Sequence, residues 1–281
     1  MRLGEAEVLC SLRGRLKRER QQATSLVVVG DHVEVSVQSD GTGVIQEVAP
    51  RRTVLERPGF RDRTRLAAAN LDLLVVVQST RLPAFNRHLV ERFLAIADRG
   101  GMSALLVVNK IDLEDPAVVG SWLAPLRALD LPIVLTCAKD GRGIERLREA
   151  LTRRLAAMVG PSGVGKSRLI NALDPGFKAR IGEISRVHEK GKHTTTASRL
   201  YPLEGGGYLA DTPGIRELAL FEGDPESLAI VFPEVVEAAA RCRFRRCSHS
   251  HEPSCAVKAA VESGAIDRDR YEHYLRLAAG G

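Results

Sequence analysis

Hydrophobic and polar residues alternate strictly over residues 33–37, Val-Glu-Val-Ser-Val, as in a strand with one buried face. Turn-forming residues flank this strand at 30–31 and 40–43, and the apolar residues Val44, Ile45 and Val48 supply a returning strand. Residues 1–60 therefore predict a small all-β domain. Several short strands in such a length favour a β-barrel of the OB-fold type, which commonly binds oligonucleotides.

The pattern changes after residue 60 to strands that alternate with helices. Runs rich in Val, Leu and Ile at 71–78, 103–108, 132–136 and 155–159 have the composition of buried parallel strands. Residues 85–99, 122–129 and 168–173 carry helical spacing. Residues 61–218 therefore predict an α/β domain with a doubly wound sheet. Pro202 precedes the short strand 208–210 and fits only an edge position, because proline lacks an N–H.

Residues 219–281 predict a third, helical domain. Tyr271, Tyr274, Leu275 and Ala278 follow the spacing of one helix face. A cluster of cysteine and histidine residues interrupts this part of the chain.

Composition places the chain among ordinary globular proteins, with 44% hydrophobic and 27% charged residues in a length of 281. Its apolar runs are too short for a membrane span, and the N-terminus shows no signal peptide, so we expect a cytoplasmic protein without a membrane partner. A monomer is the default expectation. The net charge of +6 favours an anionic partner, nucleic acid foremost. The basic residues of the N-terminal domain fit an RNA-binding face and a solvated face equally well: Arg13, Arg15, Lys17, Arg18, Arg20, Arg51 and Arg52.

Residues 160–167, Gly-Pro-Ser-Gly-Val-Gly-Lys-Ser, match the phosphate-binding loop pattern at every fixed position. A predicted strand precedes the loop and a predicted helix follows it, which makes a chance glycine-rich turn the weaker interpretation. Lys166 would reach the β- and γ-phosphates, and the Ser167 hydroxyl would ligate Mg²⁺. The residues predicted to surround the phosphates are Gly160, Pro161, Ser162, Gly163, Val164, Gly165, Lys166, Ser167 and Arg168.

Guanine is the base that the sequence predicts. Asn109-Lys-Ile-Asp112 follows the strand 103–108, and the Asp112 carboxylate can accept two hydrogen bonds from guanine that adenine cannot donate. Asn109 can bond the base edge and the neighbouring loop, and the Lys110 stem can lie along the base. Cys137-Ala-Lys139 follows the next strand, where the N–H of Ala138 can point at the guanine carbonyl. GTP is therefore the predicted ligand.

Two further segments complete a nucleotide switch. Asp211 ends the strand 208–210 and would hold Mg²⁺ through water, while the N–H of Gly214 would bond the γ-phosphate. The segment 191–196, Gly-Lys-His-Thr-Thr-Thr, lies where a first switch belongs, and one of its threonines would complete the Mg²⁺ shell. Ile215 stands where related enzymes carry a water-orienting glutamine, so intrinsic turnover should be slow. His193 is the local candidate to replace that glutamine, and a surface histidine without a role is the alternative.

These motifs occur in an unusual order, with base recognition ahead of the phosphate loop. The order predicts a circular permutation, which is tolerated because domain termini usually lie close together. The segment after Gly214 then runs directly into the C-terminal domain.

Cys242, Cys247, His249 and Cys255 lie within 14 residues and form the ligand set of a closed structural zinc site. His251 is a rival fourth ligand. The arginines of this loop, Arg241, Arg243, Arg245 and Arg246, could contact phosphate.

The chain resembles the ribosome small-subunit-dependent GTPase A family (RsgA, also called YjeQ). The resemblance rests on the β-barrel, the permuted motifs with G-P-S-G-V-G-K-S and K-H-T-T-T, and the final C-x4-C-x-H-x2-E-P-x-C. It implies a GTPase that acts late in small-subunit assembly, binds rRNA near the decoding region and is stimulated by the small subunit. It also implies that His193 is catalytic, that Thr195 and Thr196 are switch residues, and that His249 rather than His251 binds zinc. Cys137 stands where serine is common in GTPases.

Three functions compete on this evidence. The first is a GTP hydrolase timed by the small ribosomal subunit. The second is an RNA-binding assembly factor in which GTP acts mainly as a conformational latch. The third is a permuted GTPase of the large subunit, against which the N-terminal barrel and the zinc motif argue.

Overall fold

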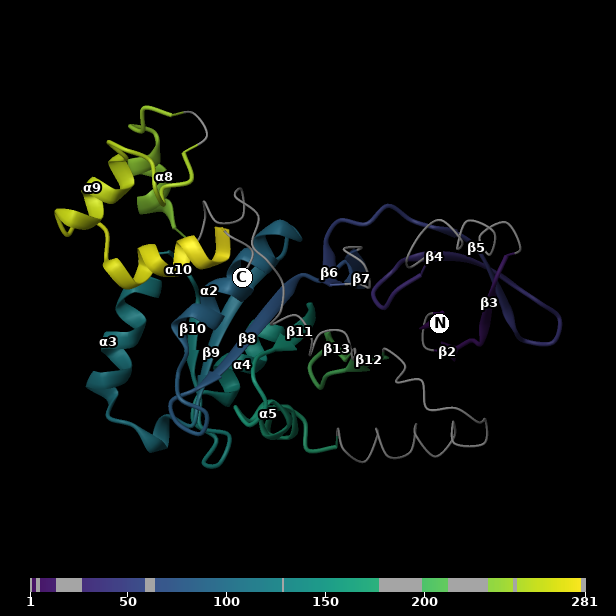
Figure 1. The fold of residues 1–281 in the computed structure, drawn as a ribbon. Coiled ribbons are helices and arrows are strands. Elements are labelled where there is room, and N and C mark those ends of the chain that lie inside the picture. Colours follow the sequence, from purple (N-terminus) through teal and green to yellow (C-terminus); the bar gives the residue numbers. More distant parts are fainter. Residues whose placement is uncertain are drawn as a thin grey trace.

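A six-stranded sheet runs through the centre of the chain in this computed structural model (Figure 1). The structure describes residues 2–3, 6–13, 27–58, 64–127, 129–176, 199–211, 232–244 and 247–278. The strands of the central sheet are β8 (Leu73–Ser79), β9 (Ser103–Asn109), β10 (Ile133–Leu135), β11 (Leu155–Val159), β12 (Arg199–Pro202) and β13 (Tyr208–Asp211). Their order is β10-β9-β8-β11-β13-β12.

Every pair in this sheet is parallel except β12 with β13, which is antiparallel. β12 lies at the edge of the sheet, so Pro202 occupies the edge position that its missing N–H requires. The predicted strands at 71–78, 103–108, 132–136, 155–159 and 208–210 are confirmed within two residues at each end.

Helices cover both faces of the sheet, as a doubly wound domain requires (Figure 1). α2 (Arg87–Arg99) and α3 (Pro116–Arg127) pack on one face, and α4 (Ile144–Leu151) and α5 (Lys166–Leu173) pack on the other. Alternate residues of β8 point to opposite faces of the sheet. Leu74 and Val76 pack in the core with α2 and α3, while Val75 and Val77 pack in the core with α4 and α5. Both faces of β8 are buried along its whole length, which explains its unbroken apolar run.

The N-terminal residues form β-structure, as predicted. The strands are β1 (Arg2–Leu3), β2 (Ala6–Glu7), β3 (Cys10–Leu12), β4 (Val33–Val37), β5 (Gly43–Val48), β6 (Val54–Pro58) and β7 (Thr64–Ala69). β4 and β5 form the predicted hairpin, and β3 adds to β5 in parallel. β6 pairs with β7 in a second hairpin that crosses residue 60. Since the described strands form separate small sheets, the OB-fold barrel remains a prediction.

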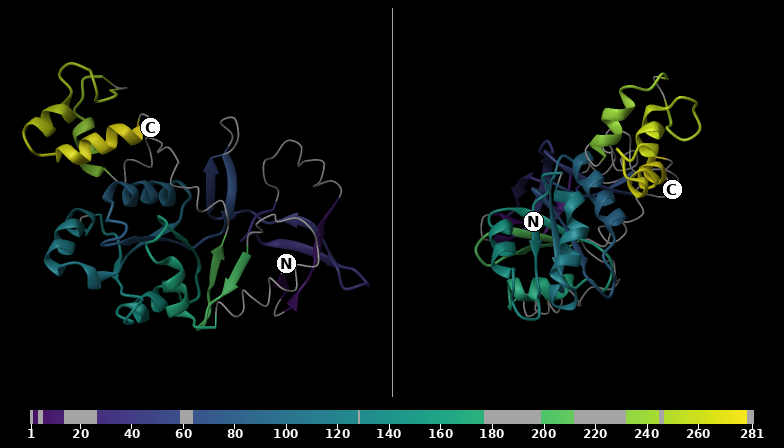
Figure 2. Two further views of the ribbon diagram at one scale, coloured as in Figure 1. Left: turned by 60° about the horizontal axis from the view of Figure 1, so that its bottom comes forward. Right: turned by 90° about the vertical axis from the view of Figure 1, so that its left-hand side faces the viewer.

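Three helices make up the described C-terminal residues: α8 (Pro233–Ala239), α9 (Ala256–Glu262) and α10 (Arg268–Ala278). They gather on the side of the molecule away from β3, β4 and β5, next to α2 (Figures 1 and 2). Phe232, Val235 and Ile266 share one hydrophobic core with α2 and α3. Among the described helices, none combines the length and apolarity that a membrane crossing needs.

The inner face of α10 agrees with the prediction at Tyr271 and Tyr274, which pack against the core, but it also includes polar residues that the apolar spacing did not indicate. Among the side chains of α10 that the structure describes, Arg270 and His273 are the most buried, at 7% and 4% exposure, while Ala278 is exposed. The reason is a buried carboxylate on the neighbouring helix, because Glu91 of α2 accepts from both of these residues. The apolar spacing therefore identified the helix but only part of its inner face.

Candidate functional site

The predicted nucleotide motifs that the structure describes meet at the carboxyl end of the central sheet. The loops that carry them follow β9, β10 and β11, which are parallel neighbours or next neighbours. Parallel strands bring the loops after their carboxyl ends to the same edge, which is where open α/β sheets bind ligands. Segments separated by as many as 55 residues, such as Asn109 and Val164, are in hydrogen-bond contact there.

The phosphate-loop segment curls back over its own lysine. Gly160, Gly163 and Gly165 all have positive φ, at 137°, 86° and 100°, a conformation that only glycine adopts without strain. The ammonium Nζ of Lys166 donates to the carbonyls of Gly160 at 2.6 Å and Pro161 at 2.7 Å. Ser162, Ser167 and Arg168 are exposed at the mouth of the loop. The helix α5 begins at Lys166, so its free N–H groups face the same opening.

Asn109 joins three loops through one side-chain amide. Its Nδ2 donates to the carbonyl of Val164 in the phosphate loop at 2.9 Å. Its Oδ1 accepts from the N–H of Ala138 and from the Thr136 hydroxyl, each at 3.2 Å. The residue is only 2% exposed, so both ends of the amide are used inside the protein. The N–H of Ala138, predicted to point at guanine, is directed at Asn109 in this structure.

Asp112 lies where a base could reach it. Its carboxylate is exposed beside η1 (Ile111–Leu113), and Oδ1 accepts from the buried Cys137 thiol at 3.2 Å. Burial raises the pKa of that thiol, which keeps it protonated and able to donate. Cys137 thus makes the hydrogen bond that a serine would make at this position. Lys139, from the same loop, is exposed.

The loop after β8 contributes contacts that the sequence motifs did not indicate. Lys110 adopts a left-handed backbone, and its ammonium donates to the carbonyl of Leu82 and, at 3.4 Å, to that of Arg81. Thr80 donates from its hydroxyl to the Lys110 carbonyl at 2.6 Å. Thr80 directly follows the buried strand β8, and Thr136 directly follows the edge strand β10. That position at the carboxyl edge of the sheet was the available signal for both threonines.

Some predicted residues lie outside the described part of the chain. These are His193, Thr195, Thr196, Gly214, Ile215, Arg245 and Arg246. Asp211 is described as the last residue of β13, which places its backbone at the same edge of the sheet as the phosphate loop. Of the seven basic residues noted in the N-terminal domain, the structure describes Arg13, Arg51 and Arg52, and Arg51 is paired with Asp31 at 2.7 Å.

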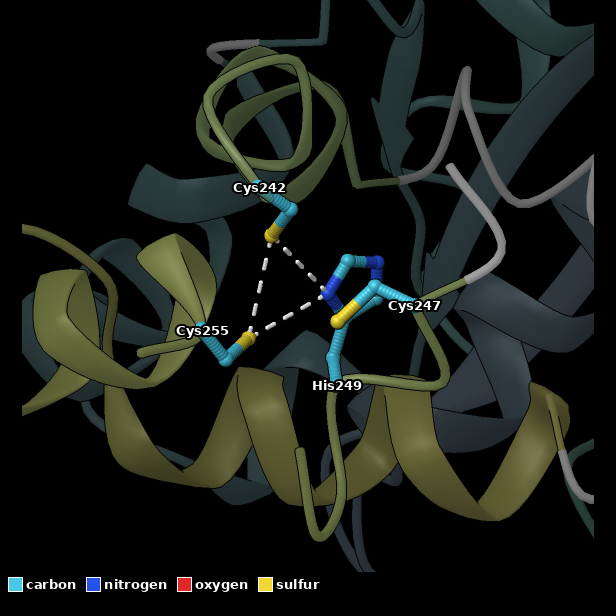
Figure 3. Close-up of side chains that lie close together, drawn as sticks. All are labelled: Cys242, Cys247, His249 and Cys255. Atoms are coloured by element: carbon cyan, nitrogen blue, oxygen red, sulfur yellow. Dashed lines mark hydrogen bonds between the residues drawn. The ribbon is translucent and has the colours of Figure 1, made fainter. Parts of the chain in front are cut away.

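The four predicted zinc ligands converge at the C-terminal domain (Figure 3). Cys242 Sγ lies 3.8 Å from Cys255 Sγ and 3.6 Å from His249 Nδ1, and His249 Nδ1 lies 3.4 Å from Cys255 Sγ. Bonds of about 2.3 Å to sulfur and 2.0–2.1 Å to nitrogen place tetrahedral ligands about 3.8 Å (S to S) and 3.6 Å (S to N) apart. These side chains therefore fit one tetrahedral ion.

The surroundings orient these ligands. Burial lowers the pKa of His249, which favours the neutral imidazole that a metal binds, and burial raises the pKa of Cys247 to about 12. The Tyr271 hydroxyl donates to the His249 carbonyl at 2.6 Å, and Glu252 accepts from the N–H of Ser248 at 2.7 Å. His251 is exposed and contacts Ser250, outside the cluster.

Comparisons with known proteins agree with this geometry. The model of the family described as RsgA GTPase matches residues 48–221. The chain is 46% identical to the small ribosomal subunit biogenesis GTPase RsgA of Chlorobaculum parvum, over 91% of this chain and 86% of that protein. It is 37% identical to the protein of the same name from Thermotoga maritima, over 96% and 88%.

Two solved structures share the fold. The crystal structure of YjeQ from Thermotoga maritima superposes with a TM-score of 0.70 at 34% identity, over 96% of this chain and 88% of that one. YloQ, described as a circularly permuted GTPase, gives a TM-score of 0.67 at 28% identity, over 96% and 84%. With base-recognition loops ahead of the phosphate loop on one parallel sheet, the chain belongs to the RsgA family of circularly permuted GTPases.

Proposed function

We propose that this GTPase hydrolyses GTP during assembly of the small ribosomal subunit and that the subunit stimulates its turnover. The observation that carries the proposal is the junction at Asn109, which joins the phosphate loop to both guanine-recognition loops. Curated relatives at 34–46% identity carry the name of small ribosomal subunit biogenesis GTPases.

Each motif has a role in this proposal. Asp112 accepts from the guanine edge, Lys110 supports the base, and Cys137 orients Asp112 through its thiol. Gly160 to Arg168 surround the phosphates, with Lys166 neutralising the β- and γ-phosphates. Mg²⁺ accompanies GTP and would be held by Ser167 and Asp211 together with Thr195 and Thr196. The N–H of Gly214 would donate a hydrogen bond to the γ-phosphate.

Ile215 cannot orient a water molecule, so the proposal assigns that function to His193. Stimulation by the subunit is then the positioning of His193 and the switch threonines against bound GTP. On this proposal the enzyme works in the cytoplasm as a monomer, the N-terminal domain is an OB-fold that binds rRNA, and one structural zinc ion holds the C-terminal domain.

The test is phosphate release from GTP and ATP by the full chain, alone, with small subunits and with large subunits. We expect slow GTP turnover that only small subunits accelerate, and no ATP turnover. His193→Ala should remove the acceleration and leave GTP and subunit binding intact, while His251→Ala serves as the matched control. Small subunits that bind without accelerating wild-type turnover would instead make GTP a conformational latch. Acceleration by large subunits alone would overturn the proposal.

A further inference from the structure

A second group of metal-ligating side chains lies where the C-terminal domain meets the central domain. His88 and Glu91 stand one helical turn apart on α2, and His273 reaches them from α10. Their ligand atoms all lie within 4.8 Å of one another. Figures 1 and 2 show α10 lying along α2. No nucleotide motif and none of the Cys/His ligands takes part in this group.

Glu91 is fully buried and divides its two oxygens between different partners. Oε1 accepts from Arg270 Nη1 at 2.5 Å and from Arg87 Nε at 3.1 Å. Oε2 faces the two imidazoles, with His273 Nδ1 at 2.6 Å and His88 Nδ1 at 3.9 Å. The arginines therefore occupy one oxygen and leave the other for the histidines. Metal-ligating carboxylates commonly have their remaining oxygen held in this way.

His88 Nδ1 has no hydrogen-bond partner among the described residues, although the atom itself is buried. A buried nitrogen without a partner costs free energy. The nearest acceptor on Glu91, Oε2, lies 3.9 Å from His88 Nδ1, which is too far for a direct hydrogen bond. Burial and the neighbouring His273 lower the pKa of His88, so its nitrogen is a neutral ligand. The ring centroids of the two histidines lie 4.1 Å apart, and the Nδ1 atom of each ring faces Oε2 of Glu91.

The surrounding charges allow a cation. Three carboxylates, from Glu91, Glu234 and Asp267, offset the three arginines near the group, Arg87, Arg270 and Arg276. An ion therefore does not enter a positively charged region. Two imidazoles and one carboxylate suit a divalent transition metal, and an ion with this set keeps a fourth position for water.

We propose that His88, Glu91 and His273 form a second metal site, which takes Zn²⁺ and clamps α10 of the C-terminal domain to α2 of the GTPase domain. Binding replaces the hydrogen bond between Glu91 and His273: the proton of the His273 imidazole moves from Nδ1 to Nε2 of the same ring by exchange with solvent, and the Nδ1 lone pair binds the ion. The 2.6 Å separation of Nδ1 and Oε2 opens to about 3.4 Å, the spacing of a nitrogen and an oxygen ligand on one tetrahedral zinc ion.

The experiment counts zinc on the full chain. Protein stripped with a chelator is titrated with ZnCl₂, freed of excess metal by gel filtration and analysed by mass spectrometry for metal. We expect two ions on the wild-type chain and one on His88→Ala. The His88 side chain is half-exposed, so we expect the His88→Ala variant to fold. Cys255→Ser should also keep one ion, at the site proposed here. The matched control, His251→Ala, should keep two.

Two readouts separate this site from the Cys/His cluster. Co²⁺ bound to thiolates gives a sulfur-to-metal charge-transfer absorption, whereas Co²⁺ at the proposed site adds only the weaker bands of nitrogen and oxygen ligands. Calorimetric titration with ZnCl₂ should show two binding events on the wild-type chain and one on His88→Ala. A wild-type chain that binds a single zinc ion, or a His88→Ala chain that binds two, would overturn the proposal.

Discussion

Asn109 shows how much of this site depends on single side chains. Its amide donates to the phosphate loop and accepts from the loop after β10, so base recognition and phosphate binding share one buried residue. Asp112, by contrast, is exposed, and among the described residues its carboxylate accepts from the Cys137 thiol alone, which leaves it available to a base.

Asp112→Asn should lower GTP affinity by about 100-fold or more, because an amide cannot accept both guanine donors and hydrogen bonds to a charged group contribute about 1.5–3 kcal/mol each. Titration with fluorescent GTP and ATP analogues measures the loss. Asp130→Asn, in an exposed turn, is the matched control and should bind GTP normally. Equal affinities of the Asp112 variant and the wild type would show that guanine is recognised elsewhere.

Gly165 is another single residue on which the site depends, because its surroundings leave no room for a side chain. Its φ is 100°, and a methyl group there would collide with the side-chain amide of Asn109. Gly165→Ala should therefore destabilise the fold by about 2–4 kcal/mol, the sum of backbone strain and a clash, and impair GTP binding.

Gly205→Ala separates these two causes. Gly205 has a similar φ of 91° but open space around its α-carbon. The Gly205→Ala variant should lose only the stability that corresponds to backbone strain, about 1–2 kcal/mol, and its GTP affinity should be unchanged. Urea unfolding of both variants makes the comparison. Equal losses would mean that the contact with Asn109 does not matter.

At the scale of elements, α2 and α10 are joined by charge as well as by apolar packing. Glu91 is 0% exposed and accepts from Arg270 and His273 across the contact between the two helices. Removing one partner from a buried ion pair leaves the others without compensation, which is more costly than losing an exposed pair.

Glu91→Gln should therefore destabilise the chain by about 3–5 kcal/mol. Glu145→Gln is the matched control, because Glu145 is 73% exposed and pairs with Arg148 on one helix. It should change stability by less than about 0.5 kcal/mol. Urea unfolding of metal-free protein at pH 7 measures both. If the two variants unfold alike, the buried group contributes nothing to the contact between the helices.

At the scale of the whole molecule, circular permutation connects the nucleotide site to the C-terminal domain in a direct way. The last described strand, β13, ends at the carboxyl edge of the sheet, and the chain then continues into the helices that pack on α2. A change at the γ-phosphate could therefore reach α8 and α10 through the segment after Gly214 and through the contact with α2.

Zinc should hold this C-terminal domain together. Chelation, or Cys242→Ser, should lower the midpoint of thermal unfolding, because zinc binding contributes folding energy to the loop 242–255, in which Phe244 is the only large apolar side chain between the ligands. Differential scanning calorimetry with and without added ZnCl₂ measures the change. An unchanged transition after verified removal of zinc would contradict this role.

Zinc affinity should also depend on pH. Burial raises the pKa of Cys247 to about 12, so the metal-free thiol is protonated at neutral pH and must release its proton when zinc binds. Affinity should then fall by at least about tenfold for each pH unit below 7, since one or more protons compete with the ion. Competition with a chelator of known affinity at several pH values provides the measurement.

The amino-acid sequence by itself determined the order of the elements, the nucleotide loops and the Cys/His cluster. Each depends on residues that are near one another in the chain. The strict alternation at 33–37 and the apolar runs at 103–108 and 155–159 became strands because local burial patterns follow the period of the backbone. The four zinc ligands lie within 14 residues, so spacing alone revealed them.

Only the tertiary structure decided which distant residues meet. The Asn109 side chain reaches Val164 because β9 and β11 lie on either side of β8, and Arg270 is buried because Glu91 lies opposite it, 179 residues away. Burial of an arginine contradicts its hydropathy and is favourable only when a partner from another element compensates its charge. Such pairings leave no periodic signal in the sequence, since they depend on how the helices and strands pack.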